Sequence, residues 1–87
     1  MAVSDALQAF RQYLQVERNA SAHTVTAYLA DVRQLLAYSE IPEDDGVLAL
    51  VAIDRAALRS WLAHLERDQG CTRRTAARKL VSLRSFF

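Results

Sequence analysis

The side chains that most often carry out catalysis or bind metals are scattered along this sequence in no recognised arrangement. The two histidines, His23 and His64, are far apart, and neither belongs to a His-x-x-x-His or Cys-x-x-Cys spacing. The single cysteine, Cys71, has no base placed near it by the sequence, so we expect it to fill space rather than act as a nucleophile. We therefore expect no catalytic residue, no metal site and no cofactor in this chain.

Acidic and glycine-containing segments do not change that expectation. Glu43, Asp44 and Asp45 are adjacent but lack the stepped oxygen ligands of a calcium loop, which favours a solvated loop. The two glycines, Gly46 and Gly70, stand alone and form no phosphate-binding loop. Binding is therefore the function to look for.

The clearest chemical signal is the uneven distribution of charge. Residues 71–87 contain five bases and no acid, whereas residues 40–54 contain five acids and no base, although the net charge is only +1. One end of the molecule should therefore attract polyanions such as nucleic acid. A solvated helix face rich in arginine would give the same pattern, so charge alone does not decide. The bases are Arg73, Arg74, Arg78, Lys79 and Arg84.

The basic segment has the period of a helix with one buried face. Its apolar residues recur at i, i+4, i+7 and i+11, which predicts a core-facing stripe of Ala76, Leu80, Leu83 and Phe87. Arg74 and Arg78 project from the opposite side, one turn apart, with the reach to contact a guanine edge or a phosphate.

Three further helices precede this one, and each has a single apolar stripe. We expect the first helix to end near residue 17 or 18, the second to cover Ala22–Tyr38, and the third to end near residue 67 or 68, before Gly70. The predicted N-caps of the four helices are Ser4, Ser21, Asp54 and Thr72.

The stripes must meet in one shared core, so we predict a single all-α domain over residues 1–87, a small four-helix bundle. In the long connection after the second helix, Leu48, Leu50 and Val51 are expected to pack against the bundle. A short strand over residues 47–53 is considered but would have no partner. No apolar run approaches the roughly 20 residues of a membrane span, no signal peptide is recognised, and one cysteine suits a cytoplasmic setting.

The second helix has an outward face that is small and lightly polar, with His23, Ala27, Ala30 and Gln34. Such a face can approach another surface closely, although an alanine-rich sequence produces one by default. Its start, Ser21-Ala22-His23-Thr24, offers two hydroxyls and an imidazole. Because free N–H groups at helix N-termini favour phosphate, the starts of the second and fourth helices could together straddle a DNA groove.

Two strings of residues resemble the N-terminal domain of tyrosine site-specific recombinases, in particular the Xer group, and its XerC branch more than its XerD branch. The first follows the pattern ER-N-x-S-x-x-T-x-x-x-Y-x-x-D from Glu17, and the second follows R-x-L-x-x-L-R-x-F-F from Arg78. The resemblance covers nearly the whole chain, from about Leu7 to Phe87. Phage and integron integrases share a looser version of the same pattern.

The resemblance implies a SAM-like, core-binding domain that forms half of a clamp around the recombination site. In that family the second and fourth helices cross the DNA in its major groove, and a C-terminal domain, absent from this chain, performs catalysis through a phosphotyrosine intermediate. The implied partners are duplex DNA, other recombinase protomers and that catalytic domain, with no membrane. The implied DNA-binding residues are His23, Thr24, Thr26, Ala27, Arg33, Thr72, Arg73, Arg74, Thr75, Arg78 and Lys79.

One position departs from the family pattern. Val81 stands where the family often has a small serine, so a direct polar contact is not expected there, while valine could still contact a thymine methyl. The function implied is DNA binding within site-specific recombination, such as chromosome dimer resolution. Two alternatives are a helical module that binds an acidic protein and a free-standing DNA-binding regulator.

Overall fold

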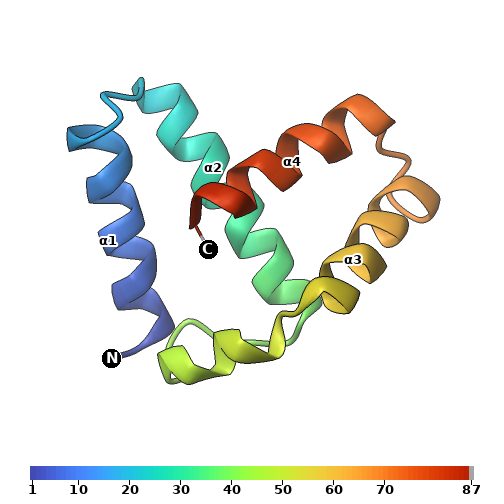
Figure 1. Cartoon of the computed structure of the whole chain (residues 1–87), viewed down its shortest axis with the longest axis horizontal. Coiled ribbons are helices and arrows are strands. Elements are labelled where there is room, and N and C mark those ends of the chain that lie inside the picture. The colour runs from blue at the N-terminus through green and yellow to red at the C-terminus, as the bar shows by residue number, and fades with distance from the viewer. Residues whose placement is uncertain (87) are drawn as a thin grey trace.

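Amphipathic stretches of the sequence form the α-helices of the molecule, and they account for most of its ordered backbone (Figure 1). The computed structural model describes residues 1–86. The elements are α1 (Val3–Val16), α2 (Ala22–Tyr38), the 3₁₀-helix η1 (Val47–Ala52), α3 (Arg55–Arg67) and α4 (Arg73–Phe86). The predicted all-α architecture is confirmed.

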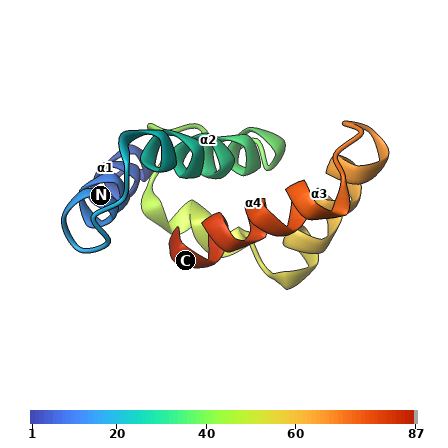
Figure 2. The ribbon, with the colours of Figure 1, turned by 90° about the horizontal axis from the view of Figure 1, so that it is seen from above.

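The helices form a flat assembly whose principal extents are 35 × 28 × 17 Å. α1 packs beside α2, while α4 crosses α2 and also contacts α3. In Figure 1 α4 crosses α2 in projection, and in the view of Figure 2 the two helices lie in separate layers, with α2 above α4. The crossing of α2 and α4 is therefore the central contact of the domain.

All four helices contribute apolar side chains to one core, as their stripes predict. Trp61 of α3 is fully buried, and its indole Nε1 has no hydrogen-bond partner among residues 1–86. Leu80, predicted on the core face of α4, is half-buried, and Phe87 lies outside the described residues. The buried apolar residues are Val3, Leu7, Phe10, Leu14, Val25, Leu29, Val32, Leu35, Leu36, Trp61, Leu65, Ala76 and Leu83.

Local capping explains where three of the helices start and where α3 ends. The side chains of Ser21 and Asp54 accept hydrogen bonds from the third residues of α2 and α3, as predicted. Thr72 does the same for α4. Gly70 follows α3 with a φ of +68°, the left-handed conformation that glycine adopts without steric cost.

The predicted cap of α1 is wrong. The helix begins at Val3, and Ser4 lies within its first turn. The N–H groups of these two residues donate to the carbonyl oxygens of Asp45 and Glu43, both at 2.8 Å, and the Asp5 carboxylate accepts from the Ala2 N–H at 2.9 Å. The acidic loop therefore supplies the acceptors that a serine cap would otherwise provide.

The segment Val47–Ala52 forms a 3₁₀-helix rather than the strand that was considered. Its turns close locally, for example where the Ile53 N–H donates to the Leu50 carbonyl at 3.0 Å, so it needs no partner strand. Residues three apart share a face in such a helix, and only Leu50 packs on the core. The expectation that Leu48 and Val51 also pack there is wrong, because they are 81% and 77% exposed.

Candidate nucleic-acid interface

The first turns of α2 and α4 are built in the same way. Ser21 Oγ accepts from the Thr24 N–H, and Thr72 Oγ1 accepts from the Thr75 N–H, both at 3.2 Å. The paired hydroxyls also bond each other, at 3.0 Å in α2 and 3.2 Å in α4. Both helices start at the upper edge of the molecule in Figure 1, on either side of the crossing. The molecule thus presents two helix N-termini, the positive ends of the helix dipoles, along one edge.

The predicted interface residues differ in how accessible they are. His23 and Thr26 of α2 are exposed, as are the first two arginines of α4, Arg73 and Arg74. Val81 is 51% exposed, which confirms its outward position. The half-buried residues of the predicted set are Thr24, Ala27, Thr75 and Lys79.

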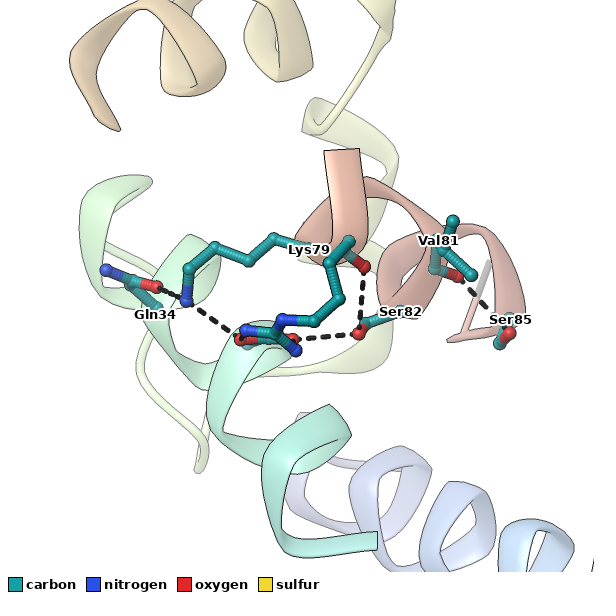
Figure 3. A network of polar contacts seen from close by, with 7 residues as sticks. Gln34, Lys79, Val81, Ser82 and Ser85 are labelled. Carbon is teal, nitrogen blue, oxygen red and sulfur yellow. Dashed lines mark hydrogen bonds and ion pairs between the residues drawn. The ribbon is translucent and has the colours of Figure 1, made fainter. Parts of the chain in front are cut away.

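At the crossing, a buried carboxylate of α2 gathers polar groups of α4 (Figure 3). Asp31, which is 2% exposed, accepts hydrogen bonds from Arg78, Lys79 and Ser82. The Lys79 ammonium lies 2.9 Å from Asp31 Oδ1 and 2.9 Å from Gln34 Oε1. A buried charge is tolerated when it is paired and hydrogen-bonded, which describes this carboxylate.

This cluster corrects two expectations about direction. Gln34, predicted to face away, turns toward α4 and accepts from Lys79. Arg78, predicted to project away from the core, has a half-exposed side chain, but its guanidinium bonds back to Asp31, with Nη1 at 2.8 Å from Oδ2 and Nη2 at 3.4 Å from Oδ1. Of the lightly polar face of α2, Gln34 contacts α4, whereas His23 and Ala30 are exposed.

Sequence reasoning gave no role to Asp31, the central residue of the cluster, although the family pattern that begins at Glu17 ends on it. Asp31 is the only acid in α2, and it shares a helix face with Tyr28 and Leu35, three residues before and four after it. Two features of the sequence could have identified Asp31. It is a single acid on a helix face beside the core, and the last helix of the chain has cations but no acid to pair with them.

Arg33 lies on another side of α2. Its Nε donates to Glu43 Oε2 at 3.2 Å, and both side chains are about half exposed. This ion pair connects α2 to the acidic loop, and an exposed pair of this kind contributes little stability.

The fifth base of the basic segment, Arg84, faces a groove between α3 and α4. The groove has a volume of about 540 Å³ and an apolar floor, and Arg55 and Arg59 of α3 also line it. Three arginines of α3 and α4 thus line one groove, together with the acid Asp54. Sequence reasoning did not anticipate this grouping, although Arg55 and Arg59 stand one turn apart in the sequence.

The remaining candidate residues have structural surroundings. His64 pairs with Asp68 at 3.0 Å and lies against the ring of Tyr38, with centroids 5.0 Å apart. Cys71 packs against the core. In the part of the chain that the structure describes, no three His, Cys, Asp or Glu side chains gather as a metal site would require, and no helix is long and apolar enough to cross a membrane.

These features define a small all-α domain with a basic helix laid across a second helix. The chain belongs to the family described as phage integrase, N-terminal SAM-like domain, whose family model matches residues 7–87. The predicted relationship to tyrosine recombinases of the Xer group is confirmed.

Individual relatives show the same relationship. The chain is 37% identical to tyrosine recombinase XerC of Lacticaseibacillus casei over 93% of its length, and 39% identical to tyrosine recombinase XerC of Pelotomaculum thermopropionicum over 90%. It is 33% identical to tyrosine recombinase XerD of Listeria monocytogenes over 98%. The matched region covers 26%, 26% and 28% of these relatives, so the chain spans about a quarter of their length. No solved structure gives a significant match.

Proposed function

We propose that this chain is the DNA-binding, core-binding domain of a tyrosine recombinase and that α2 and α4 grip the recombination-site duplex. The observation that carries the proposal is the basic helix α4, which lacks acids and exposes Arg73, Arg74 and Arg78 in a domain of this family. Arginine suits this role because its planar guanidinium can bond a phosphate or a guanine edge with two parallel N–H groups.

The proposed contacts come from both helices. The starts of α2 and α4 approach phosphates through their N-terminal turns, while arginines of α4 reach bases or phosphates in the major groove. Lys79 is already bonded to Asp31 and Gln34, so a DNA contact there would compete with those bonds. The proposed DNA-contacting residues are His23, Thr24, Thr26, Ala27, Arg33, Thr72, Arg73, Arg74, Thr75 and Arg78, with Lys79 as a flanking residue.

The whole recombinase is proposed to break and rejoin DNA strands through a phosphotyrosine intermediate formed by its catalytic domain. In this scheme the domain described here holds the duplex in register and contributes no reacting group. Further recombinase protomers, bound to the same site, are the proposed protein partners, and chromosome dimer resolution is the proposed role.

Titration of a short mixed-sequence duplex at two salt concentrations tests the proposal. Binding should weaken steeply as salt rises, because each neutralised phosphate releases counterions. Three phosphate contacts correspond to a slope of about −2.7 in a plot of log affinity against log salt. The Arg74→Ala variant should weaken binding and reduce that slope by about 1.

A matched variant removes an equal charge elsewhere. Arg11 is an exposed arginine of α1, a helix that takes no part in the proposed contact. Arg11→Ala should leave the slope unchanged. Absence of DNA binding even at low salt would contradict the proposal and favour the alternative of an acidic protein partner. Equal effects of the two alanine substitutions would show that DNA binds elsewhere or without a defined face.

A further inference from the structure

We infer that Asp31 is a positioning residue, which holds the Arg78 guanidinium in the orientation used to contact DNA. The inference rests on the proposed function, since it concerns how one proposed contact is prepared. Asp31 itself is buried and acidic, and so is unsuited to touch DNA. Its influence passes through the arginine that it holds.

The carboxylate is fixed independently of Arg78. Ser82 Oγ donates to Oδ2 at 2.8 Å and Lys79 Nζ donates to Oδ1 at 2.9 Å, so each oxygen has a second donor from α4. Ser82 is fully buried and the Lys79 side chain is only 14% exposed. Water therefore competes only weakly with Asp31 for these two donors. Asp31 is therefore a rigid acceptor for a third group.

Arg78 uses only part of its donor capacity on this acceptor. A guanidinium has five N–H groups, and Asp31 takes one from Nη1 and one from Nη2. The Nε–H and one N–H on each terminal nitrogen remain, on a side chain that is 48% exposed. These are the groups that bond a phosphate or a guanine edge, and holding them in place reduces the entropy lost on binding.

The cluster keeps a positive charge despite its carboxylate. Asp31 contributes one negative charge, whereas Arg78 and Lys79 contribute one positive charge each. Lys79 is the more buried of the two cations, so the remaining charge is presented by Arg78. The acid therefore orients the arginine without cancelling its attraction for DNA.

Asp31→Asn tests the inference because positioning and simple electrostatics predict opposite results. The substitution raises the net charge by one, which on its own strengthens attraction to DNA. Loss of positioning should instead weaken binding of the 87-residue chain to the mixed-sequence duplex about three- to tenfold, in the range of coupling between contacting side chains. Asp44→Asn makes the same charge change in the exposed loop and should leave affinity equal or slightly higher.

A double-mutant cycle with Arg78→Ala identifies the route of the effect. If Asp31 acts through Arg78, Asp31→Asn should change DNA affinity little once Arg78 is alanine. A further loss of similar size in that background would overturn the inference. So would an Asp31→Asn variant with wild-type circular dichroism that binds DNA as tightly as the wild type or more tightly.

Asp31→Asn alone leaves the Lys79 ammonium without its buried partner, and this could prevent folding. A second pair of variants tests the inference in that case. The double variant Asp31→Asn/Lys79→Gln avoids that charge and is compared with Lys79→Gln alone. Weaker DNA binding by the double variant supports the inference, and equal or tighter binding overturns it. A wild-type chain that binds no DNA overturns the proposed function and this inference together, whereas the other negative results overturn the inference alone.

Discussion

The role inferred for Lys79 from the sequence differs from the role that its contacts in the structure indicate. In the sequence it is one of five bases in a segment without acids, which favours a contact with DNA. In the structure its stem crosses to α2, its ammonium bonds Asp31 and Gln34, and only 14% of the side chain is exposed. Its bonds lie within the protein, at the junction of the two helices.

Lys79→Met is therefore expected to reduce stability rather than DNA contact. The variant keeps the apolar stem but removes one hydrogen bond to the buried Asp31 carboxylate and one to Gln34. The loss should lower the free energy of unfolding by about 1–3 kcal/mol. The slope of log DNA affinity against log salt should stay at the wild-type value. Chemical unfolding and salt-dependent titration measure the two quantities separately.

Arg74→Ala is the matched comparison for Lys79→Met. Arg74 is exposed, so its replacement should change the free energy of unfolding by no more than about 0.5 kcal/mol. Its effect should appear in the salt slope instead. If Lys79→Met reduced the slope by about 1, as expected of a phosphate contact, the sequence-based prediction that Lys79 lies at the DNA would be supported.

At the scale of elements, most helix ends were predictable from local signals, although the local signal at Ser4 gave the wrong cap. Ser21, Asp54 and Thr72 cap the helix that each one precedes, and Gly70 ends α3 in the left-handed conformation. Each of these features acts within a few residues of its own position. A short stretch of sequence therefore contains the information needed to predict each of these helix ends.

The two glycines allow a direct test of this reasoning. Gly70→Ala should cost about 1 kcal/mol, because an alanine in the left-handed conformation is strained. Gly46→Ala is the control, since Gly46 has a φ of −66° and a Cβ there would meet nothing within 4 Å. It should be neutral or slightly stabilising, because alanine restricts the unfolded chain. Thermal unfolding midpoints compare the two, and equal midpoints would contradict the role assigned to Gly70.

Features that join distant parts of the chain were not predictable in the same way. The first turn of α1 is capped by carbonyls of Glu43 and Asp45, which no capping pattern near Val3 can reveal. The cluster at the crossing joins Asp31 to residues of α4 that follow it by about 50 positions. Helical period placed most of the core correctly, but it could not say which polar groups would meet when α4 crossed α2.

On the scale of the whole molecule, the position of the acidic loop relative to the basic helix α4 is the feature that bears most on the proposed DNA contact. The acidic loop after α2 lies at the lower edge in Figure 1, whereas α4 begins at the upper right. In the proposed orientation, the acidic loop makes the lower edge unfavourable for DNA and α4 faces the duplex.

This arrangement predicts which amides respond to DNA. On titration with a short duplex, amide resonances at the starts of α2 and α4 should shift, together with those around Arg78. Resonances of residues 40–46 should hardly move. A heteronuclear correlation spectrum at each titration point measures the pattern. Shifts concentrated in residues 40–46, with α4 unaffected, would contradict the proposed orientation.

The buried Trp61 has a practical consequence. It is the only tryptophan of the chain, its side chain is fully buried, and its indole N–H has no hydrogen-bond partner among residues 1–86. An indole in such apolar surroundings fluoresces at short wavelength and is shielded from dissolved quenchers such as acrylamide. Its emission should therefore shift to longer wavelength only when the core opens, giving the chain a built-in optical reporter of folding.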